Sequence, residues 1–137
     1  MTMSRRCGPR FAAMIAASVA TQGVQAEWNS TIAAGGGSVY MTDRTRMRIE
    51  GVRRQVWLKG DHSRDRAEPS RSSMTLVGID CAAMTTATLS WTTYAADGTV
   101  TGSQETPDGG SSAGYEPIVP ETVIARVAEI ACRQEPT

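Results

Sequence analysis

Histidine and cysteine, which serve most often as catalytic bases, thiol nucleophiles and transition-metal ligands, are scarce in this sequence. Its 137 residues include a single histidine, His62, and three cysteines. His62 lies in a short polar run, residues 61–65, and neighbouring side chains of one loop diverge too much to form a catalytic triad. No histidine, cysteine or carboxylate spacing is typical of a metal site. We therefore expect no enzyme and no cofactor, and we expect His62 to be an exposed loop residue.

Long apolar runs are also absent, except for residues 11–20 near the N-terminus. Three arginines and no acid precede this run, and Val24-Gln25-Ala26 has small residues at the positions that a signal peptidase requires. The run is too short to span a bilayer. The pattern predicts a secretory signal peptide over residues 1–26 and a domain over residues 27–137. A buried N-terminal helix is the alternative.

Cysteine usage in the remaining chain points to an oxidising compartment. Cys7 leaves with the predicted signal peptide, so that Cys81 and Cys132 remain. In an exported protein, an even pair of cysteines most simply forms one disulfide. Closing a loop of about 50 residues would stabilise the fold by about 4 kcal/mol. Two separate buried thiols are the alternative.

Hydrophobic patterning predicts strands followed by one helix. The strands are expected over residues 38–42, 45–49, 52–59, 74–81, 86–95 and 99–101. Residues 61–73 and 103–114 are polar loops. The helix over residues 123–132 starts after Pro120 with Thr122 as its N-cap. This order is typical of an α+β domain built on an antiparallel sheet of five to six strands.

The helix needs an apolar surface on which to pack, because three turns alone are marginal in water. Val77, Ile79 and Cys81 share one face of their predicted strand by the two-residue period. We expect the helix to pack on that face through the side chains of Ile124, Val127 and Ala131.

Four segments in this order resemble the bacterial surface-adhesin protein E family. They are residues 38–43 (SVYMTD), 79–81 (IDC), 94–100 (YAADGTV) and 115–120 (YEPIVP), the last running into a helix that ends at Cys132. The resemblance implies a curved antiparallel sheet with the helix tethered by a disulfide across its concave face. It also implies an exported, often dimeric adhesin for extracellular proteins. Because no cysteine lies near Ala26, we expect free export to the periplasm or medium without a membrane anchor.

Charge is segregated along the chain. Residues 44–71 hold nine basic and four acidic side chains, whereas residues 72–137 hold two basic and eight acidic ones. A turn at Glu50-Gly51 would place Arg48 opposite Arg53, Arg46 opposite Gln55 and Arg44 opposite Trp57. Arg54 falls on the apolar side of this hairpin, and the sequence pattern does not explain a charged residue there.

These charges predict a partner-binding face. Its residues are Arg44, Arg46, Arg48, Arg53 and Trp57, with Trp57 stacked against Arg44. A polyanion or an acidic protein patch would relieve the repulsion between the arginines. Alternatives are a solvated face paired with nearby acids, or a homodimer in which this hairpin meets the acidic half of another copy. Nucleic acid is disfavoured by export and by the acidic total.

The sequence thus favours an exported, adhesin-like binding module acting on extracellular or envelope partners. The alternative from a different class is a soluble periplasmic protein with a structural or stress-related role and no host ligand.

Overall fold

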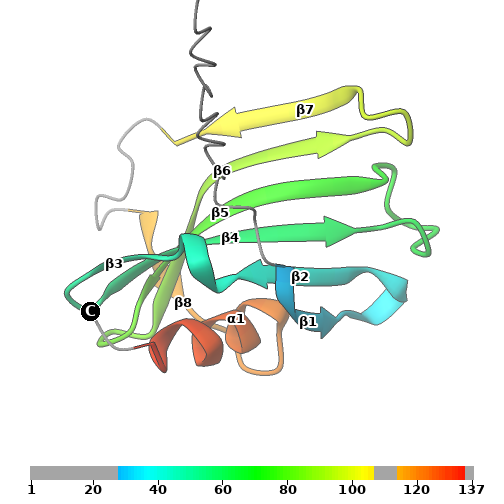
Figure 1. Ribbon diagram of the computed structural model, residues 1–137. Helices are drawn as coiled ribbons and strands as arrows, with labels where there is room; N and C mark the ends of the chain where they lie inside the picture. The colour runs from blue at the N-terminus through cyan, green and yellow to red at the C-terminus, as the bar shows by residue number, and fades with distance from the viewer. Residues whose placement is uncertain (1–27, 107–113, 135–137) are drawn as a thin grey trace, which may run out of the picture.

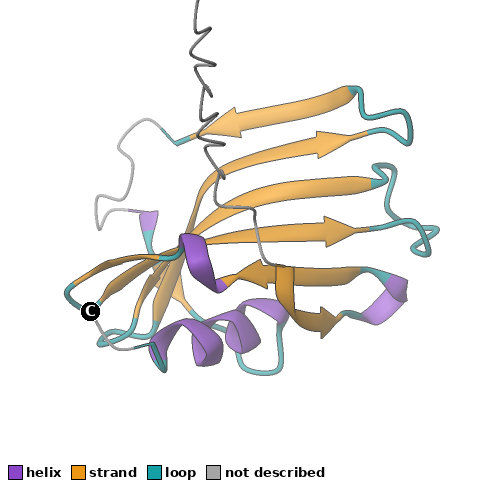
Figure 2. Cartoon of the chain, in the orientation of Figure 1, coloured by secondary structure: helices purple, strands orange, loops and turns teal. Residues whose placement is uncertain are grey.

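The computed structural model describes residues 28–106 and 114–134, and both parts form one open antiparallel sheet with one α-helix against it (Figures 1 and 2). The predicted signal peptide and the centre of the predicted loop 103–114 lie outside the described residues. The strands are β1 (Trp28–Ala33), β2 (Val39–Asp43), β3 (Arg48–Glu50), β4 (Arg53–Asp61), β5 (Ser72–Asp80), β6 (Thr85–Tyr94), β7 (Val100–Glu105) and β8 (Glu116–Pro117). The helices are the 3-10 turns η1 (Gly35–Gly37) and η2 (Arg44–Arg46) and the α-helix α1 (Val123–Cys132). None of the described helices is long and apolar enough to cross a membrane.

The sheet is a meander with two short additions. Its main path runs β1-β2-β4-β5-β6-β7, while β3 pairs with β4 and β8 pairs with β6. The predicted fold class is confirmed: six strands lie on the main path, and α1 packs in the hollow of the bent sheet (Figure 1). The prediction missed β1 and β8. It also ended β7 too early, because the strand continues to Glu105.

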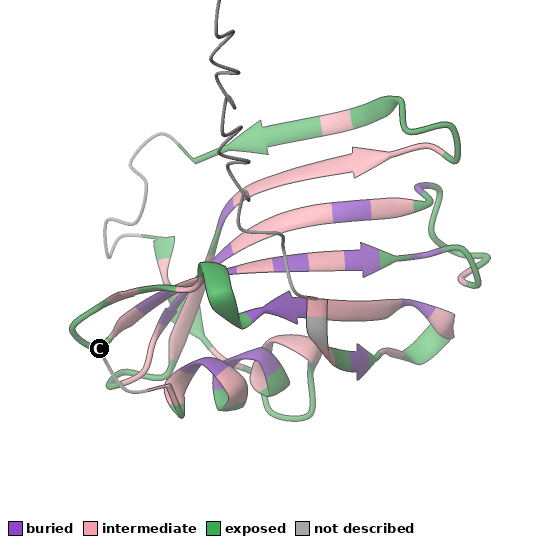
Figure 3. Cartoon of the chain, in the orientation of Figure 1, coloured by how far each residue is buried: buried purple, intermediate pink, exposed green. Residues whose placement is uncertain are grey.

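Strand β4 shows how the two-residue period separates the faces of the sheet. Arg54, Val56, Leu58 and Gly60 are buried, whereas the residues between them are only half-buried. Val56 and Leu58 of this set belong to one core cluster with residues of α1, and we call the side on which they pack the inner face. We call the opposite side the outer face. Figure 3 shows the buried and half-buried positions alternating along β4. Apolar burial on the inner face is the main stabilising term of this fold.

Helix α1 begins and packs as its sequence predicts. The Thr122 hydroxyl accepts a hydrogen bond from the Ala125 N–H, which satisfies one of the free donors at the helix start. Val127, Ala128 and Ala131 are fully buried against the core cluster, and Ile124 is packed at its margin. The helix therefore depends on the inner face of the sheet for its stability.

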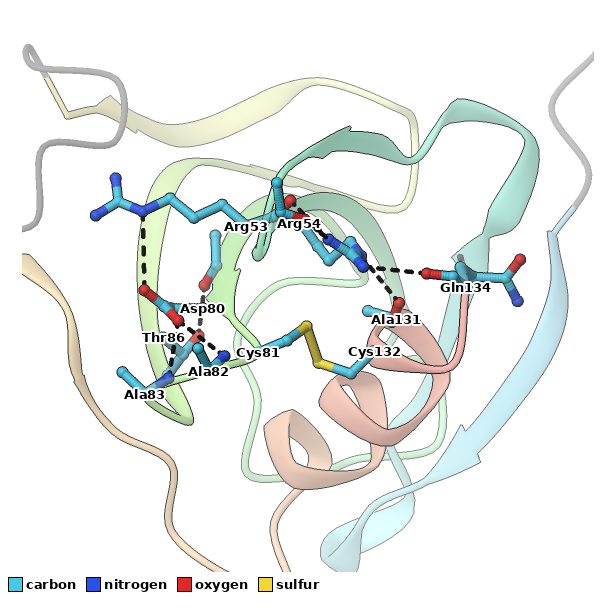
Figure 4. Close-up of a disulfide and its surroundings, with 12 residues drawn as sticks. Arg53, Arg54, Asp80, Cys81, Ala82, Ala83, Thr86, Ala131, Cys132 and Gln134 are labelled. Carbon is cyan, nitrogen blue, oxygen red and sulfur yellow. Dashed lines mark hydrogen bonds and ion pairs between the residues drawn. A yellow bond between two sulfur atoms is a disulfide. The ribbon is translucent and has the colours of Figure 1, made fainter. Parts of the chain in front are cut away.

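A disulfide joins Cys81, just after β5, to Cys132 at the end of α1 (Figure 4). Their Cα atoms are 5.6 Å apart, within the usual range for a disulfide. The predicted pairing is confirmed. The same end of the helix receives Arg54, whose Nε and Nη2 donate to the carbonyl oxygens of Ala131 and Gln134 at 3.3 and 3.1 Å.

Arg54 is therefore buried because it caps the helix C-terminus. Its Nη1 also donates to the carbonyl oxygen of Gly51 at 2.7 Å, so the guanidinium bridges the β3–β4 turn and α1. A cation at this position satisfies free carbonyls and complements the negative end of the helix dipole. Its place on the apolar side of the hairpin is thus explained by α1 rather than by the hairpin itself.

Candidate functional site

The β3–β4 hairpin carries the predicted binding face, but its turn lies one residue later than predicted. Glu50 pairs with Arg53, so the two turn residues are Gly51 and Val52, and Gly51 has a φ of +58°. Such a turn favours glycine because of the left-handed backbone. Arg48 consequently faces Gln55 rather than Arg53. Because this shifts the register by two residues, Arg48 and Arg53 still share the outer face.

The predicted pairs Arg46–Gln55 and Arg44–Trp57 are also wrong. Both arginines lie in η2, which interrupts the strand before β3. Asp43 causes this interruption, because its Oδ1 accepts from the backbone N–H and hydroxyl of Thr45. Arg46 is 3.2 Å from the fully buried Asp43 carboxylate. Arg46 thus offsets part of a buried negative charge. Removing Arg46 would destabilise the fold, because the buried carboxylate would lose one of its charge contacts.

Basic and aromatic side chains alternate over the outer face. Arg53, Trp57 and Lys59 of β4 share this face by strand periodicity, as does Arg48 through its pairing with Gln55. Two cation–π contacts occur here: Arg53 lies 4.9 Å from the ring centroid of Tyr115, and Lys59 lies 5.8 Å from that of Trp28. We call this set the outer stripe, comprising Arg48, Arg53, Trp57, Lys59, Trp28 and Tyr115.

Carboxylates partly balance the outer stripe. Arg48 forms an exposed ion pair with Glu50, and Arg53 lies 3.9 Å from Asp80. Asp80 is further engaged, since its Oδ1 accepts from the backbone N–H groups of Ala82 and Ala83 in the turn before β6 (Figure 4). The exposed Arg48–Glu50 pair contributes little to stability, so it leaves Arg48 available to a stronger anionic partner.

The outer stripe includes three residues that the sequence pattern did not select. Trp28, Lys59 and Tyr115 come from three separate segments of the chain. The hydroxyl end of Tyr115 reaches β5, where a Cβ on Gly78 would be only 2.2 Å from its hydroxyl oxygen. The glycine thus makes room for the phenol ring. A glycine inside a predicted strand indicates such a close approach, although it does not reveal which side chain approaches.

Beside Trp57 the outer face has a shallow depression of about 490 Å³ over β6 and β7. Ser90, Thr92, Ser103 and Glu105 line it together with the indole. Aromatic rings, hydroxyls, an amide and one carboxylate are among its lining groups, and such a lining can contact a polar macromolecular surface.

His62 is buried, contrary to the expectation of an exposed loop residue. Its Nδ1 is 2.8 Å from the Ser38 hydroxyl, and its Nε2 is 2.9 Å from the Ser73 hydroxyl. The Ser38 hydroxyl donates its proton to Asp65 at 2.8 Å. Ser38 therefore accepts from Nδ1–H, and in the neutral ring Ser73 donates to Nε2. The histidine ties the loop over residues 62–71 to the sheet.

Two ionisable groups beside this histidine have shifted pKa values. Burial, with the nearby charges of Glu68 and Asp65, raises the pKa of the Tyr40 phenol above its ordinary 10.0. The Ser38 hydroxyl and the Ala67 N–H lower the pKa of Asp65 below its ordinary 3.8. Both shifts arise from structural contacts. The part of the chain that the structure describes contains no cluster of three or more metal-ligating side chains.

These features define a disulfide-tethered domain of one sheet and one helix, with a basic and aromatic outer stripe. The family model of surface-adhesin protein E matches residues 28–133. The chain therefore belongs to the surface-adhesin protein E family, as its motifs indicated. No curated protein and no solved structure matches the chain. Family membership indicates an exported protein with an adhesin-like, non-enzymatic role.

Proposed function

We propose that this protein is an exported binding module, adhesin-like, that contacts an extracellular or envelope partner through the outer stripe. Family membership supports the adhesin-like role, and the outer stripe supports the location of the contact. Arg48 and Arg53 project from one sheet face beside Trp57, while the helix occupies the opposite face. Arginine and tryptophan are the side chains that most often dominate binding at interfaces.

The chemistry of the outer stripe favours an acidic partner. Arg48 is 67% exposed, and Lys59 and Arg53 add positive charge along the same face. A polyanion or an acidic protein patch would replace weak exposed ion pairs by several simultaneous charge contacts. Arg44, exposed in η2, extends the positive charge toward β2, whereas Arg46 contributes mainly through Asp43.

Binding to immobilised heparin, a defined polyanion, tests this function. We expect binding that weakens as salt rises, because salt screens exposed charges. The double variant Arg48→Glu/Lys59→Glu should weaken it by about tenfold or more. The double variant Arg126→Glu/Arg133→Glu, at two exposed arginines in and just after α1, changes the net charge by the same amount. It is the matched control and should bind nearly as the parent does. Equal losses in both variants would show a net-charge effect and would refute a specific face.

Cell fractionation tests the adhesin-like role separately. Exposure at the surface or release into the medium is expected. Recovery solely from periplasmic fluid would favour instead a soluble structural or stress-related protein of the periplasm. Analytical ultracentrifugation tests whether the outer stripe instead contacts the acidic half of a second copy. If it does, the parent protein should be a dimer and Arg48→Glu should be a monomer.

A further inference from the structure

Strand β7 forms an open edge of the sheet. It pairs with β6 and with no other described strand, and it lies at the margin of the sheet in Figure 1. Five of its six residues are exposed, and it contains no lysine, arginine or proline. Natural sheets usually protect such edges with those residues, because free backbone groups can pair with another strand. Only a register shift near Val100, opposite Thr93 and Tyr94, interrupts this edge.

The direction of the backbone groups follows from one hydrogen bond. The N–H of Thr106 donates to the carbonyl oxygen of Leu89 at 2.8 Å, so it points toward β6. In an antiparallel ladder, successive residues alternate in direction. The backbone N–H and carbonyl groups of Ser103 and Glu105 therefore point outward, away from β6.

A groove on the inner face lies directly beside this edge. It has a volume of about 460 Å³ and is bounded on one side by the loop residues Glu68, Pro69 and Ser70. Its floor is Trp91, whose ring crosses to the edge strand, since a Cβ on Gly102 would lie 3.1 Å from the indole. A strand added to β7 would thus place alternate side chains next to an aromatic ring.

The charge of this groove indicates which side chain of an added strand it would accept. Glu68 is the one ionisable residue among its lining residues, and the remaining polar groups are the hydroxyls of Ser70, Thr93 and Thr101. An aromatic face with a carboxylate beside it favours a cation, through cation–π attraction and ion pairing. This preference is opposite to that of the outer stripe.

We propose that β7 binds an extended basic peptide segment of a partner protein as an additional strand, with a lysine or arginine side chain lying over Trp91 toward Glu68. Backbone pairing supplies the affinity and the groove supplies the selectivity, as in other proteins that bind peptides by strand addition. A second copy of β7 is a poorer occupant, because the strand carries Glu105 and no basic residue.

The test uses the purified full chain and the labelled peptide Lys-Thr-Lys-Thr-Lys-Thr-Lys. Fluorescence anisotropy should show binding at least tenfold tighter than that of the peptide with glutamate at each lysine position. Alternate residues of a strand direct their N–H groups to opposite edges. N-methylation of either all lysines or all threonines should therefore abolish binding in one case and preserve it in the other. Equal binding of both methylated peptides would refute strand addition and indicate charge attraction alone.

Protein variants locate the contact. Ser103→Pro removes an outward N–H without touching the β6–β7 ladder, and we expect it to weaken binding about tenfold, as the loss of one or two hydrogen bonds would. Ser103→Ala is the matched control and should bind normally. Glu68→Gln should reduce the preference for the lysine peptide. Unchanged peptide binding in Ser103→Pro would overturn the proposal. A parent protein that is a dimer and becomes a monomer in Ser103→Pro would also overturn it, because a second copy would then occupy the β7 edge. Arg48→Glu tests the outer stripe and should leave peptide binding unchanged, so failure of either proposal is recognised separately.

Discussion

Arg54 of β4 donates a hydrogen bond to the carbonyl oxygen of Ala131, the residue before the disulfide cysteine Cys132 (Figure 4). The sheet and the helix are therefore joined twice at one place, by a covalent bond and by a buried cation. The disulfide limits how far α1 can separate from the sheet. The arginine determines how the last turn is oriented, because its planar guanidinium donates in fixed directions.

Substitution of Arg54 tests the polar part of this junction. Arg54→Met keeps the length of the side chain but removes the guanidinium donor to the carbonyls of Ala131 and Gln134, of which Ala131 still accepts from the backbone N–H of Gln134. We expect the free energy of unfolding to fall by about 2 to 3 kcal/mol, measured by urea denaturation. Arg126→Met, in an exposed pair with Glu129, should change it by about 0.5 kcal/mol or less. Equal effects would contradict the capping role.

Reduction tests the covalent part. The disulfide closes a loop with a sequence separation of 51 residues, and its loss should lower the free energy of unfolding by about 4 kcal/mol. The double variant Cys81→Ala/Cys132→Ala is the control, because a reducing agent should not alter its stability. Alkylation of the denatured, unreduced protein followed by mass spectrometry should leave both cysteines unmodified. Modified cysteines at those positions would show that the bridge does not form.

The hydrogen bonds of His62 predict its tautomer. Since Ser38 donates to Asp65, the neutral ring must carry its proton on Nδ1. Long-range proton–nitrogen NMR spectra distinguish the two tautomers directly, and a proton on Nε2 would contradict the assignment. Ser73→Ala removes the donor to Nε2 and should destabilise the protein by about 1 to 3 kcal/mol. Ser103→Ala, at an exposed serine of β7, is the control and should have little effect.

Asp65 makes stability depend on pH in the acid range. Its native pKa is lowered, chiefly by the Ser38 hydroxyl, so its ionised form is favoured in the folded state. The contribution of this group is fully present above the unfolded value near 3.8 and is lost as the pH falls through the lower native value. In Asp65→Asn, stability should be reduced at pH 6, and its difference from the parent should shrink below pH 4, as followed by urea denaturation. A difference that does not vary with pH would exclude this linkage.

The predictable parts of the fold follow from local signals. Pro120, Thr122 and the apolar spacing of residues 123–132 determine where the helix begins and ends, and strand periodicity identified the face that receives it. Two cysteines in an otherwise thiol-free domain indicated the bridge. The helix and the strand face depend on residues close in sequence, and the disulfide depends on the one pairing that two cysteines allow.

The missed features depend on contacts between distant segments. Nothing near Arg54 in the sequence indicates the carbonyls of α1, which lie 77 residues further along the chain. His62 is buried and bonded by two hydroxyls from elsewhere in the chain, Ser38 just before β2 and Ser73 in β5. The first residues of the predicted strand 45–49 instead belong to η2, because the Asp43 side chain caps that turn. The outer stripe likewise includes Tyr115, which reaches β5 from the segment before the helix.

The Cys81–Cys132 bridge also divides the chain mechanically. Strands β6, β7 and β8 and helix α1 lie inside the closed loop, while β1 to β5 lie before it. If the protein were stretched from its two ends, the 51-residue loop could not extend until the bridge was reduced. The stretched chain would then be shorter by about 170 Å, at the reach of an extended residue. The β7 edge would thus remain within a covalently closed segment even under tension that unravels the first half of the sheet.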